Sequence, residues 1–423
     1  MRILHTADWH LGKTMDGRDR QPEQEQFIDE ICGIAEQEAV DLVLIAGDVF
    51  HTPNPGAAAE ELFYFALDRL SNHGVRGVVV IAGNHDNPER LCAPSPLADR
   101  LGITLVGLPR DEIYPTSYTP AGRVKRIQCG PSWLELAMPS CDHSAVLAAL
   151  PYPSEGRLRQ LMSRTLAEEE MQQGYAAMVK AAMERLSANF RRDTINIALS
   201  HIFVRGCMEC PESENQIQQV GGIYAVDASV FPATAQYIAL GHLHRPQALG
   251  GAVPGRYAGS PLQYSFAETG QAKSVTLVDV VPGESAAVRE ILLTAGKPLV
   301  KWRATAGLEQ VYRWVEEGRD AAAWIDLELS VTQPLTMDQI QTLRRIQPGF
   351  VTIRPVIHLT GEGVDKLNEL RHLSAEQMFA RFYERQTGGA VAEPGLIKLF
   401  LDLTGETESF DDPKEREEAN ETA

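Results

Sequence analysis

The segment VVVIAGNHD (residues 78–86) is highly informative about the fold, because an apolar run leads directly into Asn84, His85 and Asp86. Short apolar runs bounded by glycine and polar residues are typical of strands buried on both faces. Ligands of open α/β sheets bind at the carboxyl ends of the strands, so such strand ends mark a candidate site. Four further segments repeat the pattern: residues 3–7 before Asp8 and His10, residues 42–46 before Asp48, residues 195–199 before His201, and residues 237–240 before His242 and His244.

Amphipathic helices are predicted between the first strands, at residues 23–37 and 57–72, and a long helix at residues 157–191. Alternating strands and helices predict an α/β fold with a parallel sheet and right-handed crossovers. Residues 274–280 and 287–293 alternate in polarity around a Pro-Gly pair, which predicts a hairpin.

The pattern changes near residue 296. Strands at 299–304, 324–330 and 350–357, separated by helices at 308–317 and 337–346, predict a small α+β module. Two amphipathic helices, 375–385 and 393–403, follow it, and an acidic tail that we expect to be disordered begins at residue 406. The residues alone leave open whether this helix pair packs on the main body or docks on another protein.

Composition limits the classes of function. The chain has 423 residues, which predicts two or three domains, and a net charge of −18, which argues against a free-standing nucleic-acid binder. The acidic tail contributes part of that charge, bound metal ions would neutralise ligand carboxylates, and a partner subunit could supply basic surface. A signal peptide and a membrane-length apolar run are both absent from the sequence, and six cysteines are too few for a disulfide scaffold, so we expect a cytoplasmic protein.

The strand-end residues predict a metal centre. Imidazole and carboxylate ligands together suit first-row ions such as Mn²⁺, Fe²⁺ or Zn²⁺, and a carboxylate can bridge two ions roughly 3.5–4 Å apart. Two ions would clamp a phosphate and lower the pKa of water toward about 7. The candidate ligands are Asp8, His10, Asp48, Asn84, His201, His242 and His244.

Three further residues are candidates for catalysis. His85 remains once the ligands are assigned, and it can protonate the leaving oxygen or stabilise charge on the phosphoryl group. Asp86 follows it and is expected to orient it. His51 lies three residues beyond Asp48, on the loop that leaves a ligand strand, and is expected to touch the substrate.

Two other motifs are weaker. Residues 7–14 imitate a phosphate-binding P-loop, but Asp8 within the loop would repel phosphate, and a nucleotide site leaves the later histidines unexplained. Cys207 and Cys210 form a single pair, whereas a structural zinc site needs two more ligands.

The five strand ends together resemble the motif set of the calcineurin-like metallophosphoesterases, and the flanking residues 6–13, 47–51, 83–91, 241–247 and 259–266 resemble the SbcD family of nucleases, relatives of the Mre nucleases. The resemblance implies Mn²⁺ at two positions. The first ion would be held by Asp8, His10, Asp48 and His244, and the second by Asp48, Asn84, His201 and His242. It also implies a catalytic role for His85 and a substrate-side role for His51. Residues 205–214 depart from the family's usual sequence after the ligand histidine.

The resemblance further implies four regions: a metallophosphoesterase β-sandwich flanked by helices (1–295), a capping domain that shapes DNA access (296–362), a helical hairpin (363–405) and the acidic tail (406–423). Residues 374–403 would dock on the ATPase partner, SbcC, in a heterotetramer with two nuclease subunits. The implied activities on double-stranded DNA are 3′→5′ exonuclease action and cleavage of hairpins and blocked ends, in repair, recombination and the replication of palindromes. A phosphatase or phosphodiesterase acting on a small substrate is the alternative, although residues 47–51 and 83–86 depart from the phosphatase pattern.

Overall fold

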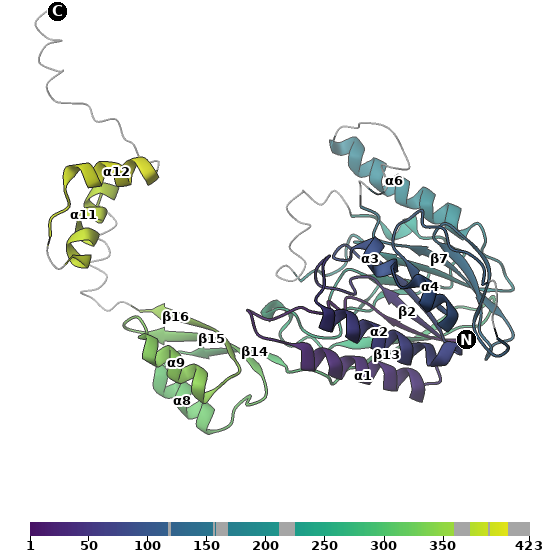
Figure 1. Ribbon diagram of the computed structural model, residues 1–423, viewed down its shortest axis with the longest axis horizontal. Coiled ribbons are helices and arrows are strands. Elements are labelled where there is room, and N and C mark those ends of the chain that lie inside the picture. The colour runs from purple at the N-terminus through teal and green to yellow at the C-terminus, as the bar shows by residue number, and fades with distance from the viewer. Residues whose placement is uncertain are drawn as a thin grey trace, which may run out of the picture.

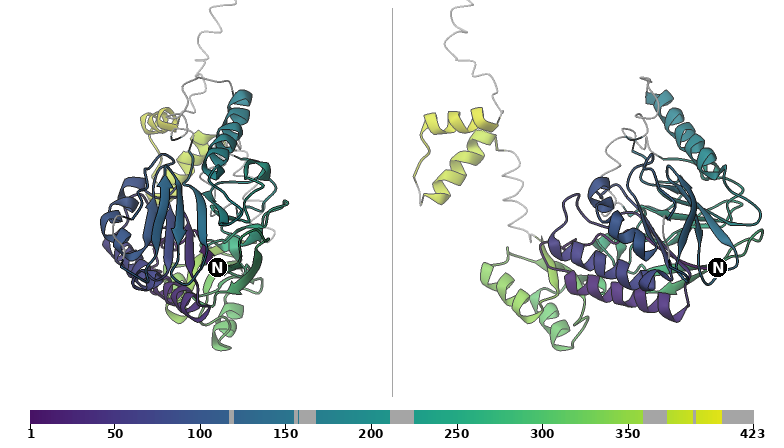
Figure 2. Two further views of the ribbon diagram at one scale, coloured as in Figure 1. Left: turned by 90° about the vertical axis from the view of Figure 1, so that its right-hand side faces the viewer. Right: turned by 45° about the vertical axis from the view of Figure 1, so that its right-hand side comes forward.

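The computed structural model describes residues 1–116, 120–154, 157, 168–210, 225–358, 373–387 and 390–404. Two sheets pack face to face, and helices cover their outer faces (Figure 1). Seen edge-on, the layers run helix, sheet, sheet, helix, with α1 and α2 on one side and α6 on the other (Figure 2). The predicted sandwich flanked by helices, with a small additional module and a helical hairpin, is confirmed.

The first sheet has the order β13-β12-β1-β2-β3-β4. Its parallel strands are β1 (Arg2–Thr6), β2 (Leu42–Ala46), β3 (Gly77–Ile81) and β4 (Ile103–Val106). The predicted hairpin forms β12 (Ser274–Asp279) and β13 (Ala287–Leu292), and β12 runs antiparallel to β1.

The second sheet has the order β10-β11-β9-β8-β7-β6-β5. Its strands are β5 (Lys125–Gly130), β6 (Trp133–Ala137), β7 (Ser144–Leu150), β8 (Ile195–His201), β9 (Tyr237–Gly241), β10 (Gln247–Ala248) and β11 (Gly255–Tyr257). The parallel pairing expected from the alternating strands and helices is confirmed for β1, β2, β3 and β4. Both sheets are mixed, and the ligand strands divide between them, with β1, β2 and β3 in the first and β8 and β9 in the second. Only Gly130 of strand β5 is buried, and the strand lacks the continuous apolar run that marked the buried strands.

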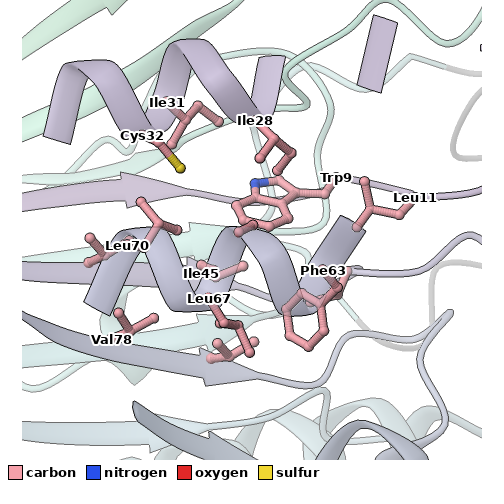
Figure 3. Packing of buried hydrophobic residues seen from close by; sticks show 14 of the residues in the cluster. Trp9, Leu11, Ile28, Ile31, Cys32, Ile45, Phe63, Leu67, Leu70 and Val78 are labelled. Atoms are coloured by element: carbon pink, nitrogen blue, oxygen red, sulfur yellow. The ribbon is translucent and has the colours of Figure 1, made fainter. Parts of the chain in front are cut away.

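Helices α1 (Gln21–Gln37) and α2 (Ala57–Ser71) cover the outer face of the first sheet. Figure 3 shows Trp9 between Ile28 of α1 and Phe63 of α2. The Trp9 ring meets Phe63 edge to face at 6.5 Å between centroids, and the indole N–H donates to the Thr6 hydroxyl at 2.9 Å. This packing fixes the loop that leaves β1. Short helices α3 (Pro88–Cys92) and α4 (Ser95–Ala98) follow β3.

Helix α6 (Glu168–Ser187) covers the outer face of the second sheet through Val179 and Met183. Part of the long helix predicted at 157–191 lies outside the described residues. No helix in the described part of the chain combines the length and apolar character needed to cross a membrane.

The small module contains β14 (Leu299–Ala304), α8 (Leu308–Glu316), β15 (Trp324–Val331), α9 (Met337–Ile346) and β16 (Phe350–Ile357), in the predicted order. Its three strands are parallel. A polar joint ties the module to the main body: Trp324 Nε1 donates to Glu23 at 2.8 Å, and the Lys297 amide donates to the same carboxylate at 2.8 Å. Glu23 in turn pairs with Arg20 at 2.7 Å.

The last described elements are α11 (Ala375–Gln386) and α12 (Pro394–Thr404). Ser374 begins α11 with a reciprocal capping box to Gln377. The two helices pack through stacked rings of Phe379 and Phe400, 4.4 Å apart. The predicted acidic tail, residues 406–423, lies outside the described residues.

Candidate metal centre

The backbone turns sharply at the ends of these strands, and the turns direct the polar side chains toward one another. Asp8, His10, Asp48 and His242 all have positive φ, at 53°, 45°, 49° and 107°. Such backbone costs roughly 1–3 kcal/mol at a non-glycine residue and persists where the surroundings hold it. Here two hydrogen bonds hold the first two loops together: the Asp8 amide donates to the Gly47 carbonyl, and the His10 amide donates to the Asp48 carbonyl, both at 3.0 Å.

Two glycines permit the close approach of these loops. A Cβ on Gly83 would lie 2.1 Å from Asp48 Oδ1, and a Cβ on Gly241 would lie 1.9 Å from the Ala46 carbonyl oxygen. Any side chain at either position would displace backbone of the opposing strand end. Glycine is therefore needed for steric reasons directly before the candidate ligands Asn84 and His242.

One half of the cluster gathers around Asp8. His10 Nε2 lies 3.0 Å from His244 Nε2 and 3.7 Å from Asp48 Oδ2. Ligand atoms of Asp8, His10 and His244 all lie within 4.8 Å of one another. Asp8 also accepts the backbone N–H of His242 at 3.0 Å, which joins the first sheet to the second.

The other half gathers around Asn84. Its Oδ1 lies 3.0 Å from His201 Nε2 and 3.0 Å from His242 Nδ1. His201 Nε2 also lies 3.4 Å from Asp48 Oδ2, and Asp8, Asp48 and His201 form a second group within 4.8 Å. Asp48 thus reaches both halves. All seven predicted ligand residues come together, and their role as ligands stays a prediction.

Burial sets the protonation of these imidazoles. It lowers the pKa of His242 to about 3 and holds the pKa of His10 well below its ordinary value. Burial also opposes a charged His201, but Asp48 more than offsets this and raises the pKa of His201 to about 9. Neutral imidazole is the form that binds metal, so most of this cluster is prepared for a cation, and Asp48 attracts one.

His85 and His51 lie beside the first half of the cluster. The His85 amide donates to Asp48 Oδ1 at 2.9 Å, and His85 Nδ1 lies 3.0 Å from the His51 carbonyl oxygen. That contact makes Nδ1 the donor and leaves Nε2 for proton transfer. The two rings stack at 5.7 Å between centroids, and the His85 ring lies 4.9 Å from that of His10. Burial lowers the pKa of His51 to about 4, so its ring is neutral.

Asp86 has different partners from those expected. Its carboxylate accepts the backbone N–H groups of Gly83 at 2.8 Å, Phe50 at 2.9 Å and Val49 at 3.1 Å. It therefore ties the loop after β3 to the loop after β2, whereas the His85 ring meets a backbone carbonyl. An orienting role of Asp86 toward the His85 ring stays a prediction.

The sequence patterns missed four residues around the cluster. The Tyr152 ring stacks on His242 at 6.3 Å, and the Tyr264 ring meets His10 edge to face at 5.5 Å. Lys13 Nζ lies 5.2 Å from the centre of the Tyr264 ring. Lys13 and Tyr264 stand in segments already identified by resemblance, but no local pattern distinguishes Tyr152 from an ordinary loop residue.

Glu268 is the fourth of these residues, and it is fully buried. Its Oε1 lies 3.3 Å from His244 Nδ1, and its Oε2 lies 2.5 Å from Lys273 Nζ. Burial opposes ionisation of the carboxyl, but Lys273 and His244 more than offset this and lower the pKa of Glu268 to about 2.

Cys207 and Cys210 are not joined by a disulfide, and Cys210 Sγ lies 3.1 Å from Gln271 Nε2. Residues 211–214 of the departing loop lie outside the described residues.

Comparison with known proteins gives two family matches. Residues 1–246 match the family described as calcineurin-like phosphoesterase, and residues 296–387 match one described as type 5 capsule protein repressor C-terminal domain. The SbcD subunit of nuclease SbcCD from Bacillus subtilis (strain 168) is 47% identical over 412 residues, which cover 97% of this chain and 100% of that protein. The SbcD protein of Rhodobacter capsulatus is 35% identical over 74% of each chain, and that of Escherichia coli (strain K12) is 29% identical over 90% of this chain and 92% of its own.

Proposed function

The chain belongs to the calcineurin-like phosphoesterases and, within them, to the SbcD nucleases, and from this we propose that it cleaves DNA with two Mn²⁺ ions. It is a hydrolase of phosphodiesters, and the resemblance read from the motifs is confirmed. The observation that carries the two-ion proposal is the overlap of two of the three candidate ligand groups, Asp8/His10/His244 and Asp8/Asp48/His201, where strands of both sheets end. The third group is His10/His51/His85.

The side chains fit divalent ions. His10 Nε2 and His244 Nε2 lie 3.0 Å apart, and the Asn84 amide oxygen meets two imidazole nitrogens at 3.0 Å. Several electron-pair donors thus point at the same small space, which a cation would stabilise. We assign Asp8, His10, Asp48 and His244 to the first ion and Asp48, Asn84, His201 and His242 to the second, with Asp48 as the bridge. Nitrogen and oxygen ligands in this mixture suit Mn²⁺.

Bound ions would polarise the scissile phosphate and lower the pKa of water toward about 7. The chain's own residues supply the remaining steps. His85 Nε2 would donate a proton to the leaving 3′ or 5′ oxygen, because its Nδ1 is already held by the His51 carbonyl. His51, neutral and beside it, would contact the phosphate or sugar of the substrate.

The C-terminal regions are proposed to direct this chemistry to DNA ends. The module within residues 296–362 would shape access to the metal centre, and its polar joint to the main body supports a fixed position. Residues 374–403 would dock on an SbcC-type ATPase. Support comes from apolar side chains exposed on the helix pair, where Phe382 is 59% and Leu403 is 78% exposed. Two nuclease subunits would act in one cytoplasmic heterotetramer on duplex ends and hairpins.

The test is nucleotide release from end-labelled duplex DNA by the purified chain, with Mn²⁺ and with EDTA. We expect Mn²⁺-dependent release by the wild type. Hydrolysis of bis(p-nitrophenyl) phosphate without any release from DNA, alone or with the ATPase partner, would contradict the nuclease and favour the small-substrate alternative. Hydrolysis of neither substrate, in a protein that binds no Mn²⁺, would overturn the metal-centre proposal itself.

A further inference from the structure

Three buried polar residues, Ser260, Glu268 and Lys273, form a triad behind His244, on the side away from the cluster. Lys273 Nζ reaches three oxygens: Glu268 Oε2 at 2.5 Å, the His244 carbonyl at 2.9 Å and Ser260 Oγ at 3.0 Å. An ammonium group has three donors, so all of them are used. Glu268 is fully buried, and Lys273 is 6% exposed. The triad therefore holds His244 by its backbone and by its ring.

The triad also defines the tautomer of His244. Lys273 is a donor only, so Glu268 Oε2 accepts from it, and an ionised carboxylate can only accept at its other oxygen. His244 Nδ1, 3.3 Å from Oε1, is then the N–H donor. The lone pair of His244 must lie on Nε2, the atom that lies 3.0 Å from His10 Nε2 in the cluster.

The other half of the cluster is supported differently. His201 Nδ1 lies 2.8 Å from the backbone carbonyl of Ala46, a neutral acceptor. A carboxylate behind a ligand imidazole fixes the ring and raises its basicity, more than a carbonyl does. The two metal positions are therefore chemically unequal.

We propose that Glu268 is a positioning residue that holds His244 in its metal-binding tautomer and thereby strengthens the first of the two metal positions selectively. The inference rests on the proposed function, since it takes His244 as a ligand of that first position. It adds a residue outside the strand-end motifs and a difference in affinity between the two ions.

Glu268→Gln tests this with an isosteric change. Lys273 would repel the amide NH₂ group, so the amide oxygen would turn toward Lys273 and the NH₂ toward His244 Nδ1. His244 would then accept at Nδ1 and carry its proton on Nε2, where it blocks the metal. We expect Mn²⁺ affinity at one position to fall about 10–100-fold, the range for loss of such a supporting group, with the other position unchanged.

A second substitution should reverse the effect. In Glu268→Gln/Lys273→Met the ammonium that imposes the amide orientation is gone. The amide oxygen can face His244 Nδ1–H again, so we expect the weakened position to recover at least part of its affinity. A purely structural role predicts the opposite, because the double variant has lost more hydrogen bonds than the single one.

The measurement is Mn²⁺ titration of the full chain by calorimetry, with electron paramagnetic resonance to distinguish spin-coupled pairs from single ions. Glu23→Gln is the matched control, because Glu23 is another buried carboxylate held by a cation, at the module joint. Two unchanged affinities in Glu268→Gln, equal loss at both positions, or no recovery in the double variant would overturn the inference. Absence of Mn²⁺ binding by the wild type would instead overturn the proposed function.

Discussion

The metal centre and the α11–α12 helix pair invert the usual placement of side chains. At the metal centre, carboxylates and imidazoles are buried where strands of the two sheets end, with Asp8 and His201 fully enclosed. On the helix pair, large apolar side chains face outward, with Met378, Phe382 and Leu399 about half exposed or more. Both arrangements are unfavourable for an isolated folded chain.

The contrast indicates what each region is proposed to bind. Buried polar atoms that point at one another are stabilised by a cation, and exposed apolar side chains are stabilised by another protein surface. We therefore expect substitutions in one region to leave the function of the other region unchanged. Loss of a metal ligand should reduce the hydrolysis of every substrate, and loss of an exposed apolar side chain on the helix pair should weaken partner binding only.

The largest effect is expected for Asp48→Asn. Asn keeps an acceptor for the His85 amide but removes the charge that reaches both halves of the cluster. We expect loss of at least one ion and a fall in bis(p-nitrophenyl) phosphate hydrolysis beyond the about 10²–10⁴-fold that a general acid contributes. Metal content by mass spectrometry and the rate of hydrolysis are the measurements. Retention of two ions would show that Asp48 is not the bridge.

The next largest effect on catalysis is expected for His85→Ala. Both ions should remain, because the predicted ligand set does not include His85, whereas DNA cleavage should fall about 10²–10⁴-fold with the loss of a proton donor. Small substrates with good leaving groups should lose less. A variant that bound fewer ions than the wild type would make His85 a ligand.

Phe382→Ala tests whether the helix pair binds the partner. Phe382 is exposed, so we expect unchanged folding and hydrolysis but weaker binding of the ATPase partner, by about 2 kcal/mol if Phe382 is an interface hot spot. Calorimetric titration with the purified partner measures this. Phe379→Ala is the contrasting variant, because Phe379 stacks on Phe400 inside the pair and its loss should also lower the melting temperature. Normal partner binding by a chain ending at residue 373 would contradict docking at this site.

The sequence predicted the regions where a local pattern and the tertiary structure agree. Strands β2, β3 and β9 are continuous apolar runs because both faces are buried. Strands β1 and β8 are also buried but are interrupted by His5 and Asn196, and polar residues follow all five strands. The division of these strands between two sheets was not predicted, because strand pairing depends on contacts between distant residues. Glu268 escaped for the same reason: its partners, His244 and Lys273, are defined by the fold rather than by spacing.

The smallest effect on hydrolysis and on partner binding is expected at the joint between the main body and the small module, which belongs to neither region. There Glu23 is buried yet already paired, with Arg20 and the Trp324 indole. Burial opposes its charge, but Arg20 more than offsets this, so the pKa of Glu23 lies below its ordinary value.

A lowered folded-state pKa stabilises the protein above the unfolded-state pKa of about 4.3, and the contribution disappears as the pH falls through the folded value. Glu23→Gln should therefore cost about 1–3 kcal/mol near pH 7 and progressively less below pH 4. Thermal unfolding of both proteins in EDTA, at pH 7 and at pH 3.5, measures the difference without a contribution from bound metal. A difference that stays constant with pH would mean that Glu23 acts at the joint through shape and hydrogen bonding alone, and that its charge contributes nothing to holding the module.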